Sequence, residues 1–170
     1  MRRARTSLIL GGFGITLIAL SAVIRANPVL VWNASASVPI GFYAVRSIDT
    51  PRVGDLVVLE PPSPLGDWLL EHGYLGADVP LIKHVVALPG QRVCRIGVTI
   101  TVDGSPVANA KLRDRFDRRL PSWQGCQTLT DDQILFLNPD TEASLDGRYF
   151  GPLPRDAIVG RAVPIWTREG

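Results

Sequence analysis

The feature that most constrains this chain is a long uncharged segment close to its N-terminus. Residues 7–24, SLILGGFGITLIALSAVI, carry no charge and are dominated by leucine, isoleucine, alanine and glycine. As a helix rising about 1.5 Å per residue, the segment spans roughly 27 Å, close to the thickness of a bilayer's hydrocarbon core. It therefore predicts either a transmembrane anchor over residues 7–25 or a signal peptide that is cleaved near Ala19–Ala22.

The distribution of charge predicts how such an anchor is oriented. The chain has 18 basic and 16 acidic residues, but Arg2, Arg3 and Arg5 all precede the apolar segment, and without them 15 basic residues face 16 acidic ones. Positive charge before a span favours a cytoplasmic N-terminus. We therefore expect an inner-membrane protein with residues 1–6 in the cytoplasm and residues 26–170 as a periplasmic domain. Its expected partners include the lipid bilayer and exclude nucleic acid.

Two cysteines, Cys94 and Cys126, are compatible with export. The chain has no C-x-x-C motif and no histidine cluster, so we expect no metal site and no cofactor. In an oxidising compartment an even pair of cysteines usually forms a disulfide, although two separate buried thiols are the alternative.

The exported part has the composition of a β protein. Glycine and proline, 16 and 14 residues in the whole chain, punctuate many short apolar stretches. This pattern predicts a mostly β, antiparallel domain of short strands with one short helix, over residues 65–76. Residues 98–109 alternate around an Asp-Gly pair, which predicts a hairpin. Residues 144–154 are predicted to form strand and turn. The charged residues 111–126 are predicted to form a solvated loop between strands.

Lys83 stands out because it interrupts an apolar strand, PLIKHVVAL. Alternation along a strand places Lys83 on the face of Leu81 and Val85, and His84 on the opposite face. Two interpretations remain open: an edge strand whose lysine reaches solvent, or a buried lysine whose pKa is lowered until a neutral amine is available as a base. A serine nucleophile would need such a base.

Other catalytic arrangements find less support. His72 lies on the predicted helix, where a surface or packing role is expected. The chain has no G-x-S-x-G motif, which argues against an α/β-hydrolase. Two serines, Ser35 and Ser37, lie close together in NASASVPIGFYAV, shortly after the apolar segment.

Four segments in order, NASASVPIGFY, LIKHVVALPGQRV, VDGSPV and ASLDGRYFGPL, carry a resemblance to a known family. The chain resembles the type I signal peptidases, which are Ser–Lys proteases, and within them the conjugative-transfer, TraF-type peptidases that mature plasmid pilins. The resemblance covers roughly residues 30–166. It implies a signal-peptidase-like antiparallel β domain behind a single N-terminal anchor.

The resemblance also implies roles for particular residues. Ser37, two residues before Pro39, corresponds to the nucleophile, and Lys83 corresponds to the general base. Ser35 corresponds to a hydroxyl that stabilises the oxyanion together with the Ser37 N–H. Loss of one such donor typically lowers the rate by about 10²–10³-fold.

Three more residues match the fourth segment. Ser144 corresponds to the hydroxyl that positions the lysine, and Asp146 and Arg148 correspond to a charged pair that supports the site. In the conjugative branch Asp146 is also implicated in activity and is counted as catalytic. The chain departs from the general pattern at Val38, where methionine is usual, and at His84, where arginine is usual, so the role of His84 is open.

The resemblance implies a membrane-anchored serine endopeptidase that cleaves an exported, membrane-embedded precursor, with a conjugative pilin as the expected substrate. The acyl-enzyme is resolved either by water or by the precursor's own amine, which gives a circular product. Two alternatives are a general type I signal peptidase and a non-catalytic domain that binds pilin during pilus assembly.

Overall fold

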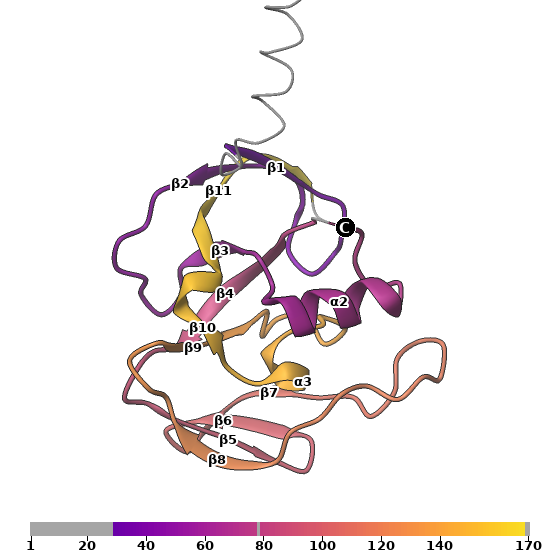
Figure 1. The fold of residues 1–170 in the computed structure, drawn as a ribbon, viewed down its shortest axis with the longest axis vertical. Helices are drawn as coiled ribbons and strands as arrows, with labels where there is room; N and C mark the ends of the chain where they lie inside the picture. Colours follow the sequence, from indigo (N-terminus) through magenta and orange to yellow (C-terminus); the bar gives the residue numbers. More distant parts are fainter. Residues whose placement is uncertain (1–28, 78, 169–170) are drawn as a thin grey trace, which may run out of the picture.

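The computed structural model describes residues 29–77 and 79–168, which fold into two antiparallel β-sheets (Figure 1). The predicted mostly β, antiparallel class is therefore confirmed. The apolar segment 7–25 lies outside the described residues. No helix within the described part of the chain is long and apolar enough to cross a membrane.

The larger sheet has seven strands in the order β1-β2-β11-β3-β4-β9-β10. Their bounds are β1 Leu30–Asn33, β2 Ile40–Arg46, β3 Leu56–Leu59, β4 Leu81–Ala87, β9 Gln133–Leu137, β10 Leu153–Pro154 and β11 Ile158–Arg168. β11 lies between β2 and β3 and pairs with both, although it is the strand furthest along the chain. β4 is central, with β3 on one side and β9 on the other.

The smaller sheet has four strands in the order β7-β6-β5-β8. Their bounds are β5 Arg92–Ile96, β6 Thr99–Val102, β7 Ser105–Asn109 and β8 Gly125–Thr128. The predicted hairpin is present as β6–β7, with Asp103 and Gly104 at φ values of 48° and 83°, the positive values that a tight hairpin turn requires. A disulfide joins Cys94 of β5 to Cys126, the residue directly opposite in β8.

The helices differ from the sequence prediction in two places. Helix α2 spans Ser63–Glu71, so it begins and ends earlier than the predicted 65–76, and the chain turns away through Gly73 at a φ of 68°. A second, one-turn helix, α3 Gly147–Phe150, occupies a segment predicted as strand and turn. Asp146 stops the extended chain there because its side chain accepts a hydrogen bond from the Arg148 N–H. A 3₁₀ turn, Arg155–Ala157, precedes β11.

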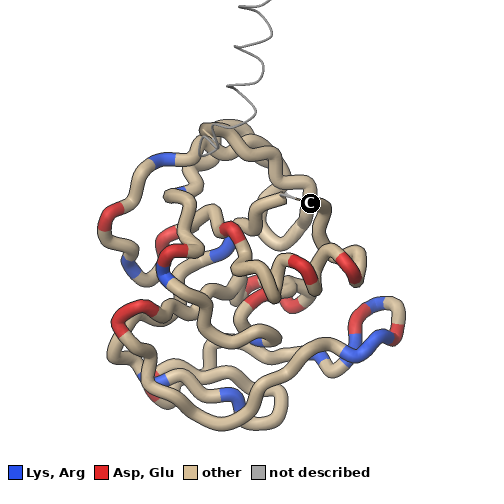
Figure 2. The backbone as a smooth tube through the Cα atoms, viewed as in Figure 1, with Lys and Arg blue, Asp and Glu red and all other residues tan. Residues whose placement is uncertain are grey.

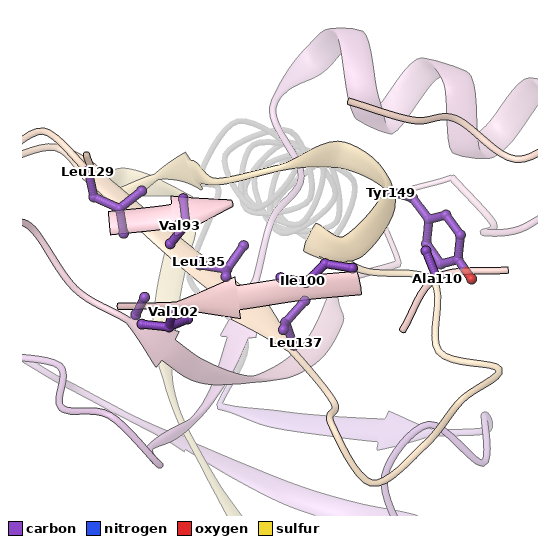
Figure 3. Packing of buried hydrophobic residues seen from close by; sticks show 9 residues of the cluster. Val93, Ile100, Val102, Ala110, Leu129, Leu135, Leu137 and Tyr149 are labelled. Carbon is purple, nitrogen blue, oxygen red and sulfur yellow. The ribbon is translucent and has the colours of Figure 1, made fainter. Parts of the chain in front are cut away.

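A hydrophobic core joins the two sheets (Figure 3). Val93, Ile100 and Val102 of the smaller sheet pack with Leu135 and Leu137 of β9. Two further clusters cover the two faces of the larger sheet, with Leu81 and Val85 in one and Ile82 in the other. The side chains of β4 alternate between faces as predicted.

One end of the larger sheet exposes an apolar face. Trp32, Phe42 and Trp166 are 46%, 41% and 55% exposed, and their rings lie close together: the Trp32 centroid is 4.7 Å from that of Phe42 and 6.3 Å from that of Trp166. We call these three side chains the aromatic face.

Charged residues gather elsewhere, for example on the loop 111–119, which projects from the molecule (Figure 2). The prediction of a solvated loop over 111–126 was wrong for its second half, because Leu120 and Trp123 pack against the core and Cys126 lies in β8.

Candidate active site

The two serines lie in the loop that joins β1 to β2, and Asn33 at the end of β1 shapes this loop. The Asn33 amide donates to the carbonyls of Ser35, Val38 and Pro39 at 2.8, 3.0 and 3.2 Å. Its Oδ1 accepts from the Ser35 N–H and the Ser35 hydroxyl at 3.2 and 3.0 Å. One buried side chain therefore holds both ends of the serine loop.

Ser35 and Ser37 are hydrogen-bonded to each other, with their hydroxyl oxygens 3.0 Å apart. The single Ser35 proton is directed to Asn33, so in this pair the Ser37 hydroxyl is the donor. Ser37 is partly exposed. Its hydroxyl is therefore oriented and open to a reactant.

Lys83 lies in the middle of the larger sheet and is 3% exposed, so the structure excludes the edge-strand alternative. Its amine donates to the Ser144 hydroxyl at 3.0 Å. Burial lowers the pKa of Lys83 from the ordinary 10.5 to about 8; the charge of Asp146 opposes this shift and that of Arg148 adds to it. A substantial fraction of neutral amine is thus present near pH 8.

Asp146 and Arg148 form a buried ion pair, with exposures of 3% and 1%. The guanidinium holds the carboxylate through Nε and Nη2 at 2.8 and 3.0 Å. The Arg148 and Asn138 backbone N–H groups complete the shell of the carboxylate, at 3.1 and 3.0 Å. Asp146 acts on Lys83 through its charge, and its hydrogen bonds all go to other groups.

Thr141 connects the serine loop with the segment that carries Ser144. Its hydroxyl donates to the Ser37 carbonyl at 3.2 Å, and its carbonyl accepts from the Ser144 N–H at 3.1 Å. Groups 104 residues apart in the sequence are thus joined directly.

The structure groups the predicted residues into three pairs: Ser35 with Ser37, Lys83 with Ser144, and Asp146 with Arg148. No hydrogen bond within the described part of the chain joins Lys83 to Ser37. The Ser37 hydroxyl is directed to Ser35, and the Lys83 amine to Ser144. Proton transfer between Ser37 and Lys83 would require rotation of the serine hydroxyl.

The remaining predicted residues lie around these pairs. The His84 ring contacts Asn138, with Nδ1 3.1 Å from Oδ1. His72 lies at the end of α2, exposed and stacked on Trp68, in accord with the expected surface and packing role. Cys94 and Cys126 belong to the smaller sheet. Within residues 29–77 and 79–168 no group of three or more His, Cys, Asp or Glu side chains is arranged to hold a metal ion.

Sequence reasoning missed Asn33, Thr141 and Asn138. Asparagine at the start of a serine-rich loop is a typical turn former, so the role of Asn33 in shaping the loop could have been predicted from the sequence. Thr141 and Asn138 carried none, because their partners lie 104 and 54–56 residues away.

Comparisons with known proteins show which family and which proteins the chain is similar to. Residues 2–167 match the model of a family described as Signal peptidase, peptidase S26. The chain is 36% identical over 98% of its length to a probable conjugal transfer protein TraF of Sinorhizobium fredii, of which it covers 93%. It is 37% identical over 79% of its length to a conjugal transfer protein TraF of Agrobacterium fabrum, of which it covers 81%.

Signal peptidases are also among the proteins that the chain resembles. It is 30% identical over 66% of its length to signal peptidase I of Leptolyngbya laminosa, of which it covers 51%. A crystal structure of a signal peptidase I from Enterococcus faecalis is similar at a TM-score of 0.40 and 19% identity, over 68% of this chain and 98% of that one.

Proposed function

The chain belongs to the signal peptidase family, and from that premise we propose that it is a membrane-anchored serine endopeptidase that cleaves an exported precursor protein. The single observation that supports this most strongly is Lys83. A lysine at 3% exposure, with a pKa of about 8 and a hydroxyl partner at 3.0 Å, fits a general base better than a structural role.

In the proposed mechanism Ser37 is the nucleophile. Its hydroxyl rotates from Ser35 towards the neutral Lys83 amine, which accepts the proton as the Ser37 oxygen attacks the scissile carbonyl. Ser144 keeps its hydrogen bond with the amine and so holds the lone pair in place. The Lys83 ammonium then protonates the departing amine of the substrate, which leaves an acyl-enzyme on Ser37.

The proposed oxyanion site consists of the Ser35 hydroxyl and the Ser37 backbone N–H. Rotation of the Ser37 hydroxyl frees the Ser35 oxygen of the hydrogen bond it accepts in the structure. Ser35 then turns its own proton from Asn33 to the developing negative charge. Release of the acyl-enzyme reverses the proton path: Lys83 activates either water or the amine of the product itself.

The proposed substrate is a conjugative pilin precursor. Its support is that two relatives that match most of this chain are described as conjugal transfer proteins. Residues 7–25 would anchor the peptidase beside the bilayer, where the apolar segment of a precursor ends. The similarity to a signal peptidase I favours one second candidate, a general signal peptidase with many secreted substrates.

The test is the intact mass of the cognate pilin precursor, co-expressed with the unchanged protein, with Ser37→Ala, or with Ser47→Ala as a matched control at an exposed serine. We expect shortening with the unchanged protein and with Ser47→Ala, and none with Ser37→Ala. A product lighter by one water than the linear fragment indicates cyclisation. Shortening by Ser37→Ala would remove Ser37 from the mechanism, and shortening of unrelated secreted precursors would favour the general signal peptidase.

A further inference from the structure

Strand β9 ends beside the part of β4 that carries Lys83. The ladder between β4 and β9 runs as far as the pair His84 and Leu137. The next residues along the chain are Asn138 and Pro139, and a proline has no N–H to offer. The backbone groups of β4 on either side of Lys83 therefore need another partner.

The side chain of Asn138 is that partner. Its amide donates to the Ile82 carbonyl at 3.1 Å, and its Oδ1 accepts from the His84 N–H at 3.3 Å. Asn138 is 2% exposed, so water does not compete for these groups. Only a side chain with both a donor and an acceptor satisfies a carbonyl and an N–H at once.

The main chain of Asn138 holds the other half of the site. Its N–H donates to Asp146 Oδ2 at 3.0 Å, and its carbonyl accepts from Arg148 Nη2 at 2.7 Å. The same carbonyl accepts from the Thr141 N–H at 3.1 Å. One residue therefore contacts β4, the buried ion pair and the loop that leads to Ser144.

We infer that Asn138 is a positioning residue, which fixes β4 on both sides of Lys83 and thereby sets the lysine amine against Ser144. The inference rests on the proposed function, since it gives Lys83 the part of the base. Ser144 follows Asn138 by six residues on a segment that Asn138 also holds. Without the Asn138 side chain, the segment from Asn138 to Ser144 would remain attached to Asp146 and Arg148 through the Asn138 backbone. It would lose the two side-chain hydrogen bonds that join Asn138 to β4.

His84 supports the orientation of the Asn138 amide. Because Oδ1 already faces a backbone donor and the amide nitrogen faces a carbonyl, His84 Nδ1 must be a donor in its 3.1 Å contact with Oδ1. The ring therefore adds a second donor to the same oxygen. His84, the residue after Lys83, therefore helps to hold the Asn138 amide in this orientation.

The first test compares Asn138→Ala with Asn109→Ala, the same change at an exposed asparagine. With the full chain in detergent and a precursor peptide, we expect Asn138→Ala to lower kcat by about 10–100-fold and to change KM by less than about two-fold. We also expect the acidic limb of the pH profile of kcat/KM to shift to higher pH by about half a unit or more. Without the Asn138 side chain, water enters the site and solvates the Lys83 ammonium, which raises the pKa of Lys83.

A role in stability alone would lower the amount of active protein and leave that limb in place, and such a result overturns the inference. If Asn138→Ala does not fold, Asn138→Asp keeps the shape and the acceptor but lacks the donor for Ile82 at neutral pH. Its added negative charge shifts the limb by itself, so the measurement for this variant is hydrogen exchange of the peptide that contains His84, which should be faster than in the unchanged protein. Exchange at the unchanged rate in this variant also overturns the inference.

Hydrogen exchange separates this inference from the proposed function, because it needs no activity. We expect the peptide that contains His84 to exchange faster in Asn138→Ala than in the unchanged protein, while the β6–β7 hairpin exchanges equally in both. Equal exchange around His84 would mean that Asn138 does not hold β4. If the unchanged protein cleaves no precursor while exchange around His84 still responds, the proposed function fails and Asn138 keeps its hold on the strand.

Discussion

The state of Lys83 depends on how the charges around it are paired. Asp146 is the anion that would keep the lysine protonated, yet Arg148 contacts it at 2.8 and 3.0 Å. The charges of Asp146 and Arg148 shift the pKa of Lys83 in opposite directions, and burial, the largest effect, lowers it. The hydrogen bonds of the Asp146 carboxylate go to Arg148 and to backbone N–H groups, so the ion pair holds the site together without a direct contact to Lys83.

Substitution of Lys83 by arginine should be as harmful as substitution by alanine. A guanidinium keeps the positive charge but cannot be deprotonated in a protein, so it cannot accept the Ser37 proton. We expect a loss of at least about 10³-fold in kcat/KM for Lys83→Arg and Lys83→Ala, measured on a precursor peptide. Lys111→Arg is the matched control at a half-exposed lysine. An active Lys83→Arg variant would refute the neutral base.

The activity should rise with pH through a limb centred near the pKa of Lys83, about 8. Below that pH the amine is protonated and cannot serve as a base, and above it the neutral form dominates. We expect kcat/KM to fall about ten-fold for each pH unit well below the limb. A limb centred near pH 10, the range of a solvated lysine, would show that the amine is not desolvated in the working enzyme.

The candidate site residues were easier to name from the sequence than the residues that support them. Lys83 was singled out by the apolar strand around it, and Ser35, Ser37 and Ser144 by the family resemblance; the four lie in two hydrogen-bonded pairs. Asn138 was not named, because its contacts depend on β9 ending beside Lys83. Such a role follows from strand pairing between distant segments, which no local pattern records.

At the scale of the elements, local signals were sufficient where the element itself is local. The β6–β7 hairpin follows from its Asp-Gly turn. Helix α3 was missed since four residues are too few to show helical periodicity. The centrality of β4 was left open because an apolar strand with one lysine has the same pattern at an edge and in the middle of a sheet.

The disulfide between β5 and β8 should contribute measurably to stability. All four residues of β8 are exposed, so few apolar contacts hold this edge strand, and the bridge closes a sequence separation of 32 residues. We expect Cys94→Ser with Cys126→Ser to lower the free energy of unfolding by about 2–4 kcal/mol, measured by urea denaturation. Thiol-blocking mass spectrometry of the unreduced protein should find both cysteines protected. Free thiols, or an unchanged midpoint, would contradict this expectation.

At the scale of the whole molecule, the β class was predictable and the division into two sheets was not. Short apolar strands and turn residues indicate an antiparallel domain, but they do not say which strands pair. The core that joins the sheets combines β5 and β6 with β9, although residues 103–132 separate β6 from β9 along the chain. Pairings over that distance depend on the entire chain.

The aromatic face should contact lipid when the full chain is reconstituted in vesicles. The chain has four tryptophans, of which Trp32 and Trp166 belong to this face and Trp68 and Trp123 do not. Because indole rings favour the membrane interface, brominated lipids should quench the emission of Trp32 and Trp166. The double variant Trp32→Phe with Trp166→Phe, which retains the other two, should be quenched little. Equal quenching of both proteins would rule out this contact.

The position of β11 has a consequence for when the site becomes complete. Among the strands of residues 29–77 and 79–168, only β11 connects by strand pairing the half that carries the serine loop, β1–β2, with the half that carries Lys83, β3–β4. Of the described strands, β11 is the last to be synthesised. On the proposed function, a chain that has not yet completed β11 has Ser37 and Lys83 on segments that no strand pairing joins. We therefore expect activity only after β11 has been delivered to the same compartment as the rest of the domain.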